Sequence, residues 1–334
     1  MRKYFLFILL LITSCNLPAP QPSQPTSSIQ VENTKPSPIS TTPAPTTPIT
    51  PVHETYILNT VIDYDRHHIT VNEIITYPNH TGQSLNSLTL AIAANLWPTC
   101  FNMNQITVDN TSVTDATINA HRLDIPLQTP LAPDSVSTIV LNYSLSLPYM
   151  DQANSLRARI FGYSDIQMNL VNWYPFIVPF KDGQWTIREP WSHGEYLVYP
   201  VADFEVNLTF TDPENAPIVA ASGFAESNGE STKYTLTEGR AFAISASRDF
   251  QVSHIQVGDT TVYSYYFPIF KSAGEAAMIA SAQALQIFAE KFGPYPHRTL
   301  SVVIADFKDS MEFSAFFFTA AAFTIYTMAP RLII

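Results

Sequence analysis

Short segments in which apolar and polar residues alternate dominate the chain after residue 53, and they restrict its fold more than any other feature. β-branched and aromatic residues are frequent in them, and turn-forming stretches such as "DYDRHH", "YPNHTG" and "TDPEN" separate them. The pattern predicts strands with one buried face, joined by tight turns. We therefore expect residues 54–263 to form a mainly β fold, a saddle-like β-sandwich. The predicted strands are "TYILNTVIDY", "HHITVNEIITY", "SLNSLTLAI", "STIVLNYSLSL", "DFEVNLTF" and "AFAISA".

The pattern changes to α/β style in residues 264–334. A helix is predicted to begin at Ser272, because "SAGE" places this residue at the N-cap and Glu275 three positions later. Gly293 and Pro294 end it. The segment "TLSVVIADF" follows and predicts a strand buried on both faces. The apolar stripe of the helix is predicted to consist of Met278, Ala282, Leu285, Ala289 and Phe292.

The first residues of the chain form a targeting signal. "MRKYFLFILLLITSC" combines two basic residues, an apolar run at 4–12 and small residues before Cys15. The apolar run is shorter than the roughly 20 residues that span a bilayer. "ITSC" resembles the lipobox of bacterial lipoproteins, so we expect removal of residues 1–14 and lipidation of Cys15. This anchor would hold the protein on a membrane of the bacterial cell envelope, outside the cytoplasm. The alternative is an ordinary secretory signal with an incidental cysteine.

Proline-rich sequence separates this signal from the β segments. Ten of the 26 prolines lie within residues 16–53, a stretch without aromatic residues. Such a composition forms no core and predicts a semi-extended stalk over residues 15–53. A proline-rich ligand for a partner domain is the alternative.

Charge and motif content exclude several classes of function. The formal net charge is −11, so we expect no nucleic-acid partner. The cysteines, Cys15 and Cys100, cannot form a disulfide framework if the first is lipidated. Nucleophile-elbow, P-loop and dinucleotide-binding motifs are absent from the sequence. A hydrolytic site around His193 and Glu195 is a remote alternative, because neighbouring residues of a polar loop do not pair unaided.

Several segments, in order along the chain, resemble the membrane alanyl aminopeptidase family of zinc metallopeptidases, the aminopeptidase N-like enzymes. They are "YILNTVIDYDRHHITVNEIITYPN", "NWYPFIVPF" at 172–180, "DFEVNLTFTDPENAPIVAASG" at 203–223, "RAFAISASRDFQV" and "KFGPYPHRTLSVVIADF". The resemblance implies a β-sandwich N-terminal domain followed by the start of a thermolysin-like catalytic domain. It also implies a parent reaction in which zinc-activated water removes N-terminal residues from peptides.

The segment "DSMEF" at 309–313 stands where the family carries a Gly-x-Met-Glu-Asn motif. The resemblance implies that Glu312, with Met311 beside it, binds the free α-amine of a substrate. A carboxylate suits this task, since it forms strong hydrogen bonds with one ammonium group. Peptide N-termini are therefore the expected ligands. Asp309 and Phe313 depart from the motif, and a carboxylate at a strand end facing water is the alternative.

Zinc ligands of the family type are missing from the sequence. The family binds zinc through H-E-x-x-H and a distal glutamate, and none of the eight histidines here has that spacing. We therefore expect a truncated and inactive family member with no catalytic residue, no metal ligand and no cofactor of its own. A noncatalytic cell-surface lipoprotein that binds peptides or proteins is the alternative. We also expect apolar surface to be exposed on the strands near 302–305 and 316–318.

Overall fold

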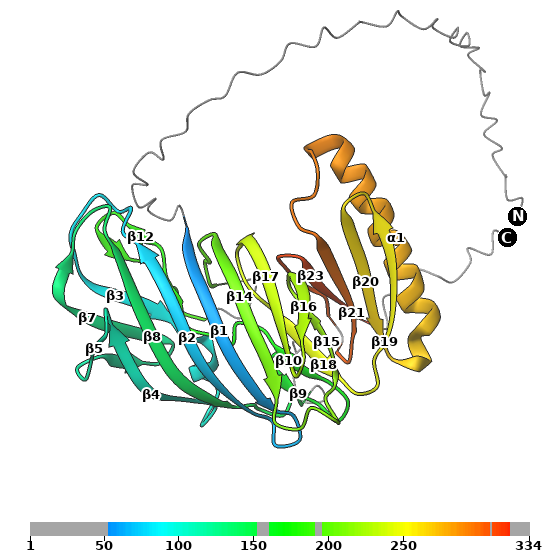
Figure 1. Cartoon of the computed structure of the whole chain (residues 1–334), viewed down its shortest axis with the longest axis horizontal. Helices are drawn as coiled ribbons and strands as arrows, with labels where there is room; N and C mark the ends of the chain where they lie inside the picture. The colour runs from blue at the N-terminus through cyan, green and yellow to red at the C-terminus, as the bar shows by residue number, and fades with distance from the viewer. Residues whose placement is uncertain (1–52, 152–159, 191–195, 308, 321–334) are drawn as a thin grey trace, which may run out of the picture. The chain divides into compact units, whose positions relative to one another are not determined.

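The computed structural model describes residues 53–151, 160–190, 196–307 and 309–320. Eight of the described strands form one sheet in the order β16-β17-β14-β1-β2-β8-β4-β5 (Figure 1). β1 pairs antiparallel with β2 and parallel with β14. The strands are β1 (Glu54–Asp63), β2 (His68–Pro78), β4 (Phe101–Val108), β5 (Thr111–Ser112), β8 (Val136–Ser146), β14 (Ala202–Phe210), β16 (Phe224–Asn228) and β17 (Ser231–Gly239).

Alternation along these strands sends one set of side chains into the core and the other to the outer face of the sheet. On β2 the buried set is Ile69, Val71, Glu73, Ile75 and Tyr77. On the outer face a row of asparagine amides crosses four strands: Asn207 donates to Asn59 (3.0 Å), Asn59 to Asn72 (3.3 Å) and Asn72 to Asn142 (2.8 Å). The mainly β prediction is confirmed.

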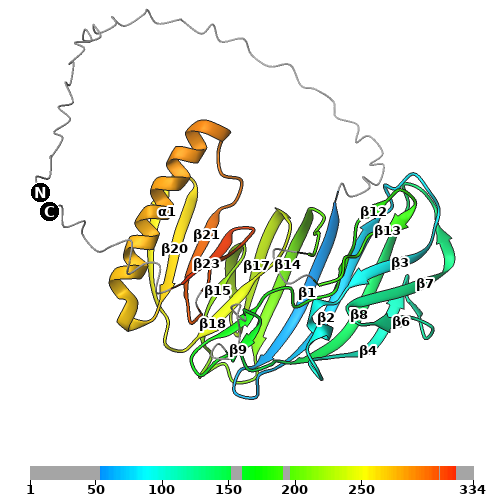
Figure 2. The same cartoon turned by 180° about the vertical axis from the view of Figure 1, so that it is seen from behind.

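Smaller sheets pack against the eight-stranded sheet and share its core (Figure 2). One has the order β11-β3-β7-β6, another the order β15-β18-β10-β9, and β12 pairs with β13. Their strands are β3 (Leu85–Ala91), β6 (Thr117–Asn119), β7 (Arg122–Leu131), β9 (Gly162–Tyr163), β10 (Met168–Leu170), β11 (Phe176–Ile177), β12 (Phe180–Lys181), β13 (Gln184–Trp185), β15 (Ile218–Ala221) and β18 (Ile244–Ser247). A short 3₁₀ helix, η1 (Ala93–Leu96), follows β3.

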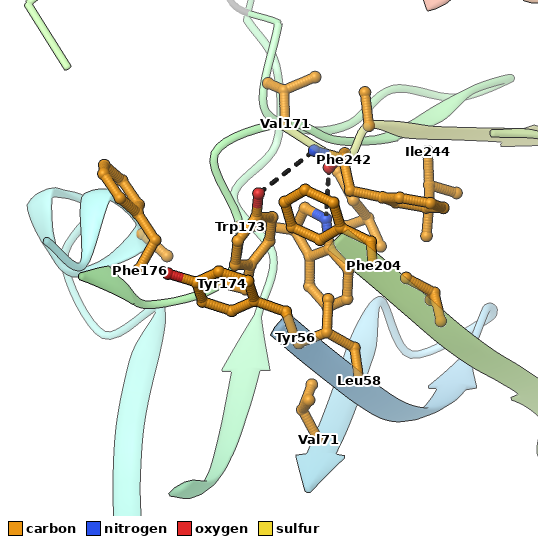
Figure 3. Close-up of a cluster of buried hydrophobic side chains, with 14 of the residues drawn as sticks. Tyr56, Leu58, Val71, Val171, Trp173, Tyr174, Phe176, Phe204, Phe242 and Ile244 are labelled. Carbon is orange, nitrogen blue, oxygen red and sulfur yellow. Dashed lines mark hydrogen bonds between the residues drawn. The ribbon is translucent and has the colours of Figure 1, made fainter. Parts of the chain in front are cut away.

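Aromatic side chains from the segment at 172–180 fill the centre of this core (Figure 3). Trp173 is fully buried and donates its indole N–H to the carbonyl of Phe242 (3.1 Å). The Tyr174 hydroxyl oxygen accepts a hydrogen bond from the backbone N–H of Phe242 (3.2 Å). Each large apolar side chain buried in this way contributes about 1.5–3 kcal/mol. The core therefore binds the irregular segment firmly to the sheet.

A five-stranded sheet of order β19-β20-β21-β23-β22 lies beside the sandwich. Its elements are β19 (Gln251–Val257), β20 (Thr260–Tyr266), β21 (Thr299–Ala305), β22 (Met311–Phe313) and β23 (Phe316–Ala320), with η2 (Pro268–Phe270) and α1 (Lys271–Phe292) between β20 and β21. β20 and β21 are parallel, so β20, α1 and β21 form a β-α-β unit (Figure 1). The expected change to α/β structure is confirmed, and β19 and β20 already belong to the new sheet.

The start and the stripe of the helix differ from the prediction. α1 begins at Lys271 with Phe270 as its N-cap, and no side chain caps it, because the preceding η2 turn runs directly into the helix. Ser272 is therefore not the cap. Of the predicted stripe, Ala282 and Leu285 are buried, whereas Ala289 is exposed and Phe292 is 81% exposed. The predicted end is confirmed, since Gly293 (φ 100°) is the C-cap and donates to the carbonyl of Ala289.

The expected exposure of the new strands is wrong. Residues 302–305 are buried, as are Phe316 and Phe318. α1 covers one face, where Leu285 packs with Val302, and the other face joins the core of the sandwich. Both faces of the sheet are therefore protected within the described part of the chain.

Polar side chains fasten the five-stranded sheet to the sandwich. Thr299 donates to the carbonyl of Gly223 (2.7 Å), and Ser301 donates to that of Ala221 (2.8 Å). At the far end of β21, the Asp306 carboxylate accepts the Ser164 hydroxyl (2.8 Å). These bonds hold β21 in a fixed position relative to the sandwich.

The described residues all fall within one compact unit, so a domain boundary at 263/264 stays a prediction. The signal peptide, the Cys15 lipidation site and the stalk, apart from His53, lie outside the described residues. None of the helices in the described ranges is long and apolar enough to cross a membrane.

Candidate functional site

The hairpin of β22 and β23 presents the predicted binding residues. Ser314 and Ala315 form its turn, and Ala315 takes a positive φ of 57°. The Ser314 hydroxyl oxygen accepts the backbone N–H of Arg240 (2.9 Å), and the Ala315 carbonyl accepts the N–H of Ser301 (2.9 Å). The turn is therefore tied both to the sandwich and to β21. β22 ends the order of its sheet, so its outer edge pairs with no other described strand.

Alternation along β22 separates the two predicted residues. Glu312 lies opposite Phe317, which packs on the α1 side of the sheet, whereas Met311 lies opposite Phe318 on the sandwich side. Met311 is half-buried and Glu312 is exposed. Within the described ranges, the Glu312 carboxylate forms no hydrogen bond and no ion pair. Its charge is therefore available to a ligand.

A cavity of about 680 Å³ adjoins β22, within the usual size range for sites that bind small ligands. Its walls are mainly apolar, with polar groups at a few positions. Most of the lining residues come from the β22 hairpin, from the segment between the sandwich strands β13 and β14, and from the residues that follow β17, and two more come from the stretches before β9 and after β10. The lining residues are Ile160, Asn172, Tyr196, Leu197, Val198, Tyr199, Arg240, Ala241, Met311, Glu312, Phe313 and Ser314.

The segment at 172–180 positions one wall of this cavity. Asn172 has a positive φ of 51°, and its side-chain oxygen accepts the hydroxyl hydrogen of Tyr199. The Tyr199 ring stacks on Phe176 with ring centroids 4.1 Å apart. Since Trp173 and Tyr174 anchor the same segment in the core, the wall is set by the packing of the sandwich.

Two lining residues of the cavity carry opposite charges, Arg240 and Glu312. The Arg240 guanidinium donates to the carbonyl of Tyr199 (3.0 Å), and no ion pair joins it to an acidic side chain in the described part. Burial raises the pKa of Tyr196, so this hydroxyl stays protonated at neutral pH. The cavity thus offers one cation, one anion and neutral polar groups.

Met311 and Glu312 both line the cavity although they lie on opposite faces of β22, and their binding of a substrate amine stays a prediction. His193 and Glu195, the remote alternative, lie outside the described residues. Sequence reasoning did not single out Arg240, Asn172 or Tyr199. The first two stand in segments that resemble the peptidases, but nothing local in the sequence shows that they face β22.

Metal ligands do not come together in the described residues. No group of three or more His, Cys, Asp or Glu side chains there could hold a metal ion. A catalytic zinc site needs three such protein ligands and one open position. Within the described ranges the side chains therefore do not supply a zinc site.

Known structures with the same fold are M1 zinc metallopeptidases. One from Deinococcus radiodurans, a mutant bound to a Tyr-Ser-Ala substrate, matches with a TM-score of 0.56 and 14% identity over 81% of this chain and 61% of that chain. A second structure of the Deinococcus radiodurans enzyme matches with a TM-score of 0.56 and 15% identity, over 80% of this chain and 60% of that one. A two-domain M1 zinc metallopeptidase mutant bound to L-tryptophan matches with a TM-score of 0.55 and 15% identity, over 81% of this chain and 62% of that chain.

No family model and no curated protein matches the sequence. The likeness to the solved structures is therefore a likeness of fold, and it bears out the family resemblance seen in the sequence at that level. The chain spans about three fifths of the length of these peptidases, 61% of the first.

Proposed function

We propose that this chain binds the free amino terminus of a peptide at Glu312, in the cavity beside β22, and does not itself hydrolyse the peptide. The observation that carries the proposal is the exposed Glu312 carboxylate, which has no partner among the described residues and lies at an open strand edge. The fold shared with M1 zinc metallopeptidases supports a peptide as the ligand.

An ammonium group matches this carboxylate in charge and in hydrogen-bonding capacity. A hydrogen bond between two charged groups is about twice as strong as one between neutral groups. The open edge of β22 adds backbone N–H and C=O groups, which can pair with an extended peptide as an added strand. A peptide with an acetylated amine would leave the carboxylate unpaired and should bind more weakly.

Hydrolysis of N-terminal peptide bonds by zinc-activated water is the second candidate function. The fold of the zinc metallopeptidases favours it. It requires two imidazoles and a carboxylate around one metal, together with a base for the attacking water. Because the described residues bring no such group together, binding without hydrolysis is the better-supported proposal.

The leader sequence supports a location for this activity. We propose that Cys15 is lipidated and holds the protein on the outer side of a bacterial membrane, with residues 15–53 as a spacer. A noncatalytic lipoprotein that captures peptides at the cell surface is consistent with this location. Mass spectrometry of the native protein tests it, and an unmodified Cys15 would contradict it.

Calorimetric titration of the full chain with Leu-Ala amide and with its N-acetylated form tests the proposed binding. We expect acetylation of the peptide and the change Glu312→Gln each to weaken binding about tenfold, the effect of losing one charged hydrogen bond. Equal binding of both peptides would contradict the proposal. Stoichiometric zinc and chelator-sensitive hydrolysis of aminoacyl anilides would favour the second candidate instead.

A further inference from the structure

The cavity beside β22 is lined by a second charged residue, Arg240, and binding of an amine at Glu312 gives this cation no role. We infer that Arg240 makes the cavity selective for ligands that carry a carboxylate close to their free amine. The inference rests on the proposed function, because it takes Glu312 as the point where the amine binds. It names the chemical class of the preferred peptide.

Arg240 and Glu312 line the same cavity without pairing with each other. In the part of the chain that the structure describes, neither side chain pairs with any other charged group. A ligand with an amine alone would neutralise Glu312 and leave the cation of Arg240 uncompensated. A ligand with an amine and a carboxylate would neutralise both charges.

Several contacts fix the position of Arg240 relative to β22. Its backbone N–H donates to the hydroxyl oxygen of Ser314 (2.9 Å), the turn residue two positions after Glu312. Its guanidinium donates to the carbonyl of Tyr199 (3.0 Å). The residue before it, Gly239, ends β17, and a Cβ there would meet the Leu236 side chain of the same strand at 2.4 Å. Arg240 and Glu312 thus border one cavity of about 680 Å³, which a small ligand can fill.

The guanidinium retains donors for a ligand. Arginine has five N–H donors in a planar fork, and one of them is used on Tyr199. Two parallel N–H groups of such a fork match the two oxygens of a carboxylate, which lysine could not reproduce. Apolar neighbours on the cavity wall, among them Leu197 and Met311, can pack against the apolar part of a bound ligand.

Two sources can supply the same carboxylate. One is the acidic side chain of the first residue of a peptide, and the other is the terminal carboxylate of a very short peptide. Both place an anion a few bonds from the free amine. A basic first residue would bring a second positive charge towards Arg240 and should be disfavoured.

Calorimetric titration of the full chain with matched dipeptides separates these cases. The probes are Glu-Ala amide, its uncharged near-isostere Gln-Ala amide, Gln-Ala with a free carboxylate, and N-acetyl-Glu-Ala amide. We expect Glu-Ala amide to bind about tenfold more tightly than Gln-Ala amide, as for one hydrogen bond to a charged group. A similar gain for the free acid of Gln-Ala would identify the terminal carboxylate as a second source.

Variants assign the preference to Arg240. Arg240→Gln should abolish the difference between the Glu and Gln probes, while its backbone bond to Ser314 remains possible. Arg240→Lys keeps the charge and should retain part of the preference. Arg298→Gln is the matched control, because Arg298 stacks on Phe224 and does not line the cavity. This control should keep the full preference.

The outcomes distinguish this inference from the proposed function. If the Glu and Gln probes bind equally and Glu312→Gln still weakens both, the role of Arg240 is refuted and the amine site stands. If N-acetylation and Glu312→Gln change nothing, the amine site is refuted and the inference falls with it. Absence of binding for every probe overturns both. These results on the unmodified chain decide the question even if Arg240→Gln fails to fold.

Discussion

Glu73 is a buried acid whose removal should stabilise the fold. It lies on the core face of β2 with no exposed surface, between Leu58 of β1 and Leu141 of β8. The Glu73 carboxyl group and the Tyr143 hydroxyl lie close enough to perturb each other's pKa. Within the described residues, however, neither the carboxyl oxygens nor the hydroxyl makes a hydrogen bond of ordinary geometry. Burial raises the pKa of Glu73 well above its usual value, so the folded protein keeps this group protonated.

The magnitude of the effect follows from two contributions. A buried polar group without a hydrogen bond costs about 1–3 kcal/mol, and methionine has nearly the same shape without that cost. In addition, the unfolded chain releases the Glu73 proton above about pH 4.5, whereas the folded chain retains it. The free energy of unfolding of the wild type therefore falls by about 1.4 kcal/mol per pH unit above pH 4.5. The fall ends where the pH passes the pKa of Glu73 in the folded protein. Glu73→Met removes this loss.

Urea unfolding of the full chain at pH 5, 6, 7 and 8 measures both contributions. We expect Glu73→Met to be more stable than wild type, with an advantage that grows as pH rises. Glu73→Gln is the matched control, since it keeps a buried polar side chain that cannot ionise, so its stability difference from Glu73→Met should be independent of pH over this range. A Glu73→Met variant that is less stable at every pH, or an advantage that does not change with pH, would refute the reasoning.

Three further predictions concern the core and the cavity. Trp173→Ala should lower the free energy of unfolding by about 3–5 kcal/mol, because it empties a fully buried site and leaves the Phe242 carbonyl unpaired; an unchanged urea midpoint would contradict this. Burial raises the pKa of Glu54 to about 7. The contribution of Glu54 to the free energy of unfolding is therefore complete below pH 4.5 and is lost as pH rises through 7. Glu54→Gln should therefore gain up to about 3 kcal/mol relative to wild type between pH 4.5 and 8, and a constant difference in urea unfolding would argue against it. Ser314→Ala removes the acceptor that ties the β22 hairpin to Arg240 and should cost about 1 kcal/mol. It should also weaken binding of Glu-Ala amide, which calorimetry would measure; unchanged affinity would mean that the hairpin needs no such anchor.

Much of the β structure could be predicted because alternation is a local property. The segment "HHITVNEIITY" places Ile69, Val71, Glu73 and Ile75 on one face, and the structure buries that face. The end of α1 at Gly293 was equally readable, since only a few neighbouring residues decide it. The N-terminus of α1 was not, because the η2 turn before Lys271 replaced the expected serine cap.

The candidate site shows where local reasoning stops. The family resemblance selected Met311 and Glu312 from a short motif, and the structure places both at a cavity. It did not select Arg240, whose backbone N–H meets Ser314 across 74 residues of sequence. That contact exists only because the chain crosses through β20, α1 and β21 before the hairpin returns to the sandwich.

The sequence by itself thus determined which segments become strands and where the helix ends, because each depends on the spacing of neighbouring residues. The tertiary structure alone decided that both faces of the new sheet are covered and that one cation and one anion share a cavity. Those features depend on how the two sheets pack, and packing joins residues whose separation along the chain carries no periodic signal.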